Sequence, residues 1–199
     1  MKKQNVGEKY LTQKKITPLE IVFIALAAIG AILYVARWIY YGVIALAIGI
    51  PGLIFTLSVK IKDAEFDALK DRILINKKIE LPKENLICGY ELESDVIVVG
   101  KDKKIRSRYY CISEINYGNS ECNVTVHTLD MCEMSAVTNK FSLSYACKAQ
   151  LEEKDVMTDV GRKKTYHLSV PECDFRIPVS AISIDTDNFI AHFKTDDNN

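Results

Sequence analysis

The sequence predicts a membrane α-helical hairpin followed by a mainly-β domain, an antiparallel sheet in the form of a barrel or a sandwich. Three observations predict this class. Residues 19–36 and 38–59 are apolar stretches, the first with Glu20 as its one charged residue and the second with none. A charged amphipathic segment follows, and beyond Leu81-Pro82 β-branched runs alternate with turn residues. About 20 apolar residues in a helix cross the roughly 30 Å hydrocarbon core of a bilayer.

The order of these patterns divides the 199 residues into five parts. They are a basic cytoplasmic tail (1–17), a hairpin of two transmembrane helices (18–59), a juxtamembrane amphipathic helix (60–78), a cytosolic antiparallel β domain (79–195) and a frayed tail (196–199). Phe66, Leu69 and Ile73 fall on one face of the amphipathic helix, which favours packing on the domain. A helix lying flat on the bilayer is the alternative, although its acidic residues disfavour anionic lipid.

Strands are predicted wherever β-branched or alternating runs lie between turn residues. The predicted strands are 95–100, 104–117, 122–129, 141–149, 156–160, 165–170, 175–179 and 189–193, with turns at 118–119, 138–140 and 161. No second helical pattern of useful length is evident, although residues 179–190 have room for a short helix. The two hairpins around Gly100 and Gly161 both end in basic tips.

The charges that flank the hairpin predict its orientation, because short cytoplasmic flanks carry an excess of Lys and Arg. Residues 1–17 hold five Lys against one Glu, and the turn between the apolar stretches holds only Arg37. Four further cations follow the second stretch, namely Lys60, Lys62, Lys70 and Arg72. We therefore expect a multi-pass protein of the cytoplasmic membrane with both termini in the cytoplasm.

Small residues recur in both apolar stretches at near-helical spacing: Ala27, Gly30, Ala31, Gly42, Ala45, Gly49 and Gly52. They would let the two helices pack closely, or would promote a homo-oligomer, and the sequence leaves both interpretations open. No ionisable residue lies deep within either stretch, which disfavours a pump or transporter.

Composition limits the function of the distal domain. Residues 79–199 hold 14 Lys and Arg against 20 Asp and Glu, which disfavours a nucleic-acid polymer as partner. The six cysteines form no C-x-x-C pattern, so we expect no metal, and the compartment decides whether they are thiols or disulfides. No phosphate-binding, dinucleotide or hydrolase motif occurs, so we expect no cofactor, no catalytic residue and no enzyme activity.

A basic cluster within the acidic domain is the candidate anion-binding site. Its members are Lys101, Lys103, Lys104, Arg106 and Arg108, to which Arg162, Lys163 and Lys164 would add if the two hairpin tips converge. The alternative is a solvated hairpin tip whose charges protect an edge strand. We interpret His127, His167 and His192 as structural, since no spacing predicts that they converge.

Stretches 9–16 (KYLTQKKI), 38–42 (WIYYG) and 58–63 (SVKIKD) resemble a group of small uncharacterised membrane proteins of Gram-positive bacteria. The layout is also similar to bacterial membrane proteins with a pleckstrin-homology-like domain, whose long final helix has no counterpart in the pattern. By layout alone it resembles the two-helix β-barrel effectors of anti-phage signalling, which bind cyclic nucleotides and damage the inner membrane.

These observations lead to two functional hypotheses. The first is a binding or scaffold module, in which the membrane hairpin displays a cytosolic β domain that recognises a protein partner or an anionic small ligand. The second is a ligand-gated membrane effector, in which nucleotide binding to a β-barrel drives assembly of the hairpin.

Overall fold

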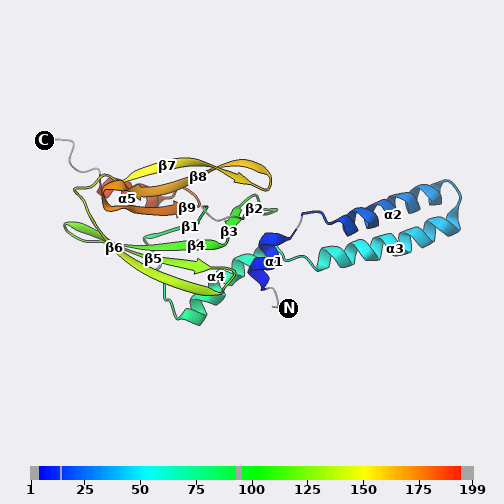
Figure 1. Cartoon of the computed structure of the whole chain (residues 1–199), viewed down its shortest axis with the longest axis horizontal. Coiled ribbons are helices and arrows are strands. Elements are labelled where there is room, and N and C mark those ends of the chain that lie inside the picture. Colours follow the sequence, from blue (N-terminus) through cyan, green and yellow to red (C-terminus); the bar gives the residue numbers. More distant parts are fainter. Residues whose placement is uncertain (1–4, 14, 93–95, 194–199) are drawn as a thin grey trace. The chain divides into compact units, whose positions relative to one another are not determined.

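The computed structural model describes residues 5–13, 15–92 and 96–193, which fall into two compact units. One unit is the segment Thr12–Lys62. The other combines the chain up to Leu11 with everything from Asp63 onward. We call them the hairpin and the β domain (Figure 1). The predicted frayed tail at 196–199 lies outside the described residues.

The hairpin consists of α2 (Pro18–Val35) and α3 (Ile39–Ser58). Thr17 caps α2 in a capping box, in which its hydroxyl accepts a hydrogen bond from the Glu20 backbone and its own N–H donates to the Glu20 carboxylate. A three-residue turn joins the helices, with Arg37 in the left-handed conformation (φ 66°). Both helices are long and apolar enough to cross a membrane.

Glycines line the contact between α2 and α3. A Cβ built on Gly49 would lie 2.7 Å from the backbone nitrogen of Ala27, and one on Gly42 would lie 2.7 Å from that of Tyr34. The small residues therefore bring the two backbones together within the hairpin. Large apolar side chains lie on the outside, where Ile32 and Phe55 are each 67% exposed.

The β domain contains three antiparallel sheets in the described part of the chain. The four-stranded sheet has the order β1-β4-β5-β6, the three-stranded sheet β7-β8-β9, and β2 pairs with β3. The strands are β1 (Leu86–Tyr90), β2 (Ile97–Val99), β3 (Ile105–Ser107), β4 (Tyr109–Tyr117), β5 (Glu121–Asp130), β6 (Ser135–Ser144), β7 (Gln150–Thr158), β8 (Gly161–Val170) and β9 (Phe175–Val179). The helical hairpin plus antiparallel β domain is confirmed, and among the described strands no closed barrel forms.

The larger sheets share one apolar core. At the junction of β1 with β9 the Ser180 N–H donates to the Cys88 carbonyl at 2.9 Å. Figure 1 shows the two sheets on opposite sides of the domain, with α5 (Ile184–His192) at one end. The core is contributed by both sheets and by α5, and includes Ile87, Ile115, Val124, Leu143, Leu168, Val170, Phe175, Ile177 and Phe189.

Three helices accompany the sheets, and they lie partly where the sequence predicted none. α4 (Asp63–Lys77) matches the predicted amphipathic helix, and Phe66, Leu69 and Ile73 are its buried face. α1 (Val6–Thr12) lies within the segment expected to be a tail, and its Tyr10 and Leu11 are buried. α5 replaces the strand predicted at 189–193 and largely occupies the stretch 179–190, which had room for a short helix; a capping box at Ser183 starts it.

Several predictions about strand limits were also wrong. The strand expected at 141–149 is the end of β6, which stops at Ser144, and the strand expected at 156–160 is the end of β7, which begins at Gln150. The single strand expected at 104–117 is divided into β3 and β4 at Arg108. The turn expected at 138–140 lies inside β6, where Thr138 and Asn139 pair with His127 and Val126 of β5. Pairing to a neighbouring strand here outweighs the turn preference of these polar residues.

Candidate functional site

A polar cluster of the β domain surrounds Arg106 on β3, whose side chain is only 1% exposed. Two carboxylates bracket its guanidinium group. Asp67 of α4 accepts from Nε at 3.0 Å and from Nη2 at 2.6 Å. Asp102, in the turn between β2 and β3, accepts from Nη1 and Nη2 at 2.7 Å each. Bidentate pairs of this kind are the strongest hydrogen bonds that Arg makes.

All five N–H donors of Arg106 are used within the protein. Nη1 also donates to the Lys104 carbonyl at 3.4 Å, which accounts for the fifth. A Cβ on Gly100 would collide with Nη1, so a larger residue at the base of this turn would have to displace the guanidinium group. Arg106 therefore serves as an internal tie between α4 and the β2–β3 turn.

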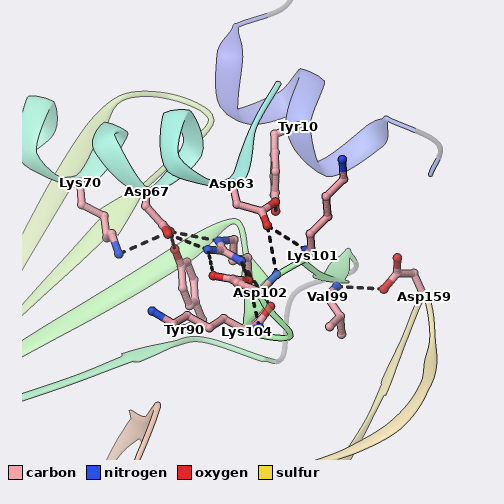
Figure 2. Close-up of polar contacts among 11 residues, drawn as sticks. Tyr10, Asp63, Asp67, Lys70, Tyr90, Val99, Lys101, Asp102, Lys104 and Asp159 are labelled. Atoms are coloured by element: carbon pink, nitrogen blue, oxygen red, sulfur yellow. Dashed lines mark hydrogen bonds and ion pairs between the residues drawn. The ribbon is translucent and has the colours of Figure 1, made fainter. Parts of the chain in front are cut away.

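A third acid, Asp63 at the first position of α4, joins α1 to the same turn (Figure 2). Its carboxylate accepts the Tyr10 hydroxyl at 2.8 Å and the backbone N–H of Lys101 at 2.8 Å. The Tyr10 ring stacks on Phe66 with the centroids 4.3 Å apart. Burial, together with the hydrogen bond to Asp63, raises the pKa of Tyr10, so its phenol remains a donor.

Asp67 has two further partners besides Arg106. It accepts the hydroxyl of Tyr90 at 3.0 Å and pairs with Lys70 at 3.5 Å. Burial raises the pKa of Asp67, but the hydrogen bond from Arg106 and the charge of Lys70 outweigh it, so that the net shift is downward. The hydrogen bond from Arg106 likewise lowers the pKa of Asp102 to about 2. We call this cluster (Tyr10, Asp63, Asp67, Asp102 and Arg106) the polar junction.

Arg108 is also paired, at a separate place. Its Nη2 lies 2.6 Å from the Asp130 carboxylate, and Nε donates to the same group at 3.0 Å. Asp130 in turn accepts the backbone N–H groups of Cys132 and Glu133, which holds the turn between β5 and β6. Arg108 keeps a 40% exposed side chain, so its outer edge still faces solvent.

The other predicted cations are exposed at the tips of two hairpins. Lys101, Lys103 and Lys104 occupy the β2–β3 turn, and Arg162, Lys163 and Lys164 begin β8. The tips are joined, because the Asp159 carboxylate in the β7–β8 turn accepts the backbone N–H of Val99 at 2.9 Å (Figure 2). Lys164 pairs with Glu153 at 2.5 Å. We call the remaining five cations (Lys101, Lys103, Lys104, Arg162 and Lys163) the basic surface.

The structure thus sorts the predicted anion-binding residues into two groups. Arg106, Arg108 and Lys164 have carboxylate partners inside the chain, whereas the five cations of the basic surface are exposed. The sequence left open whether the two tips converge, and the hydrogen bond from Val99 to Asp159 joins them. Anion binding itself stays a prediction, and it now depends on the basic surface.

Polar contacts also join the segment that precedes α2 to the segment that follows α3. The Gln13 side-chain amide donates to the Ile61 carbonyl at 2.9 Å and accepts the Ile61 N–H at 3.0 Å. Lys60 pairs with Glu20 at 2.8 Å and donates to the Lys15 carbonyl. The segments that enter and leave the two helices are therefore held side by side within this unit.

The three histidines lie in separate environments. His127 contacts Glu114 and Thr138 at 2.9 Å each, and His192 stacks on Tyr117 with the centroids 4.0 Å apart. His167 is buried on β8. Within residues 5–13, 15–92 and 96–193, no group of three His, Cys, Asp or Glu side chains is arranged to hold a metal ion.

The six cysteines are free thiols, and two of them adjoin each other. The sulfur atoms of Cys147, after β6, and Cys173, in the 3₁₀ helix η1 (Pro171–Cys173), are 3.2 Å apart. Their mutual hydrogen bond, together with partial burial, raises the pKa of Cys147. Burial raises the pKa of Cys111 and Cys122 to about 11, which is typical of unreactive core thiols.

Sequence reasoning had not selected the acids of the polar junction. Asp63 and Asp67 lie four positions apart and so on one face of α4, beside the buried Phe66, which is the one local sign of their role.

Comparison with known proteins adds nothing to this site: no family model, no curated protein and no solved structure matches the chain.

Proposed function

We propose that this chain is an integral membrane protein whose α2–α3 hairpin crosses the cytoplasmic membrane twice and displays the β domain in the cytoplasm as a binding module. The observation that carries the proposal is the arrangement of side chains in the hairpin, with glycines inside and large apolar residues outside. In water such a surface would be strongly unfavourable, whereas in lipid it is the expected one.

The charges and aromatic residues around the hairpin support the proposed orientation. Lys60 and Lys62 follow α3, while the turn between the helices has Arg37 as its one charged residue. Trp38, Tyr40 and Tyr41 beside that turn are all more than half exposed, as in an interfacial aromatic belt. Both termini then belong on the cytoplasmic side, and the thiols of the β domain are in a reducing compartment.

The proposed role of the β domain is recognition of a protein partner or an anionic small ligand rather than catalysis. Its basic surface supports this role, because exposed cations concentrated in an otherwise acidic domain favour an anionic group. The layout similar to that of small membrane proteins of Gram-positive bacteria is compatible with the same role.

The test is a topology map of the full chain in cells. We expect the protein to stay with membranes after alkaline carbonate washing. A cysteine introduced by Tyr40→Cys should react with a membrane-impermeant maleimide in intact cells, whereas the native Cys147 should react only after permeabilisation. Recovery of the chain in the soluble fraction, or labelling of Cys147 in intact cells, would contradict the proposal.

The polar junction favours a second candidate, a ligand-gated membrane effector. Through Asp63 it joins α1, which precedes the hairpin, to α4, which follows it, and to the β2–β3 turn. Movement of that turn would therefore act on both chain segments that lead to the hairpin. Controlled expression with a cyclic nucleotide supplied would then depolarise the membrane and arrest growth. A steady membrane potential with each nucleotide tested would exclude this candidate and leave the passive module.

A further inference from the structure

We propose that the basic surface binds the headgroups of anionic phospholipids in the membrane that the hairpin crosses, so that the β domain rests against the bilayer. This inference rests on the proposed function, since it needs α2–α3 to be in a membrane. Its partner is a lipid surface, recognised by phosphate charge together with an apolar contact.

The charge of the surface is available to an outside ligand. Lys101, Lys103 and Lys104 are exposed within four consecutive positions. Asp102 lies among them, and both of its carboxylate oxygens accept hydrogen bonds from Arg106. At the second tip Arg162 and Lys163 are exposed, and the nearby Asp159 accepts from the Val99 backbone. Asp102 and Asp159 are thus engaged by groups of the protein itself, while the side chains of the nearby lysines are exposed. Polybasic segments next to a membrane are attracted to anionic headgroups in this way.

Exposed apolar residues adjoin these cations. Met157, the cross-strand partner of Arg162, is 68% exposed, and Val160 in the same turn is 49% exposed. Basic and apolar side chains together are typical of surfaces that lie in the headgroup region.

The chain also restricts how far the surface can move from the end of α3. Asp63, whose carboxylate holds the backbone N–H groups of Lys101 and Asp102 at 2.8 and 3.4 Å, comes five residues after Ser58, the last residue of α3. Five residues span at most about 18 Å when fully extended. The membrane surface potential decays over about 8–10 Å at physiological salt, and this tether keeps Asp63 and the Lys101 backbone that it holds within about twice that distance of the end of α3.

The experiment uses the full chain in lipid nanodiscs made of phosphatidylcholine alone or with about one third phosphatidylglycerol. Surface lysines are acetylated with a water-soluble reagent, and the rate at each site is measured by mass spectrometry. We expect acetylation of Lys101, Lys103, Lys104 and Lys163 to be several-fold slower in the anionic discs, and the difference to disappear in high salt. Lys140 on β6, also exposed, is the internal control and should react equally in both discs.

A charge-matched pair of variants tests whether these lysines cause the effect. Each lysine near an anionic surface strengthens binding about fivefold, so K101Q/K103Q/K104Q should remove the protection of Lys163. K101R/K103R/K104R, which preserves the charge, should keep the protection of Lys163. K83Q/K140Q/K148Q, which removes the same charge elsewhere, should also keep this protection. Retained protection in the first variant would overturn the inference.

The outcomes separate the two proposals. Failure of the chain to enter nanodiscs would contradict the proposed function. Entry with equal acetylation rates in both discs would overturn the lipid inference alone. Equal protection in neutral discs on addition of inorganic phosphate would assign the surface to a soluble anion, and would overturn the lipid as its ligand.

Discussion

The hairpin and the β domain use the same apolar residue types in opposite places. In the hairpin, Ile32 and Phe55 lie outside and Gly42 and Gly49 lie between the helices. In the β domain the large apolar side chains are inside, where Phe175 and Leu168 are at most 2% exposed. A domain in water is stabilised by removing apolar area from solvent, while helices in lipid are held by close backbone approach and by polar groups at their ends.

The hairpin and the β domain also differ in where their polar side chains lie. The β domain buries a charged side chain, Arg106, and satisfies every one of its donors. The hairpin keeps its polar contacts at its open end, where Gln13 and Lys60 hold the two segments together. The two units should therefore respond to different substitutions.

The largest effect is expected for R106M in the β domain. Removing one member of a buried ion-paired group leaves the carboxylates uncompensated and typically costs 3–5 kcal/mol. Because Asp67 and Asp102 keep partial access to water, we expect a loss of about 4 kcal/mol rather than the upper limit. The opening free energy of the slowest-exchanging amides of β4 and β5, from hydrogen exchange of the full chain, measures it. K104M, which places methionine at an exposed site instead, should change this opening free energy by less than about 0.5 kcal/mol. Equal losses of opening free energy in R106M and K104M would contradict the prediction that Arg106 of the polar junction stabilises the domain more than Lys104 of the basic surface.

The next effect concerns the one adjacent thiol pair among the described residues. Oxidation by diamide should join Cys147 to Cys173, as two thiols lose two hydrogens and the azo reagent gains them. The closed loop spans 26 residues, for which about 3.5 kcal/mol of stabilisation is expected. Non-reducing electrophoresis and hydrogen exchange measure the link and its effect. C147S should abolish both, whereas C111S should not. An unchanged response in C147S would contradict the prediction.

A smaller effect is expected for G49L in the hairpin. A leucine there must displace the α2 backbone at Ala27, and overpacking of this kind costs about 2 kcal/mol. Trp38 is the one tryptophan of the chain, so its fluorescence during titration with dodecyl sulfate reports on the hairpin. I48L places the same side chain at a neighbouring exposed position and should have almost no effect. The comparison of the two units would fail if I48L were the more damaging variant.

The smallest effect is expected for Y10F, which keeps the ring stacked on Phe66 and removes the hydrogen bond to Asp63. The loss should be about 1 kcal/mol and should speed amide exchange in α1 before that in β4. Y40F, at an exposed tyrosine, is the control. Unchanged exchange in α1 would show that the Phe66 contact alone fixes this helix.

The sequence was most informative where a long pattern had one physical cause. Two long apolar stretches predicted α2 and α3, and the spacing of Phe66, Leu69 and Ile73 predicted the buried face of α4. Short elements were missed because they have too few residues for a period to appear. α5 covers nine residues, and its signal was the cap at Ser183 rather than an apolar stripe.

The candidate site could be predicted only in part. The cations of both tips were selected from local charge, and their exposure at the β2–β3 and β7–β8 turns fits that reasoning. The burial of Arg106 depends on Asp67, which is 39 residues away and belongs to a helix rather than to the sheet. Alternation along a strand indicates which face a residue occupies, but it gives no information about which distant acid approaches that face.

The position of α1 has a consequence for how the protein is made. Gly7 lies against the backbone of Met131, and Tyr10 needs Asp63 and Phe66, all of which leave the ribosome after the hairpin. Helix α1 therefore cannot pack on the β domain until strands far downstream in the sequence have folded. The segment whose packing completes the β domain is thus made before the strands that it contacts, and loss of the Tyr10 hydroxyl would act on that late step.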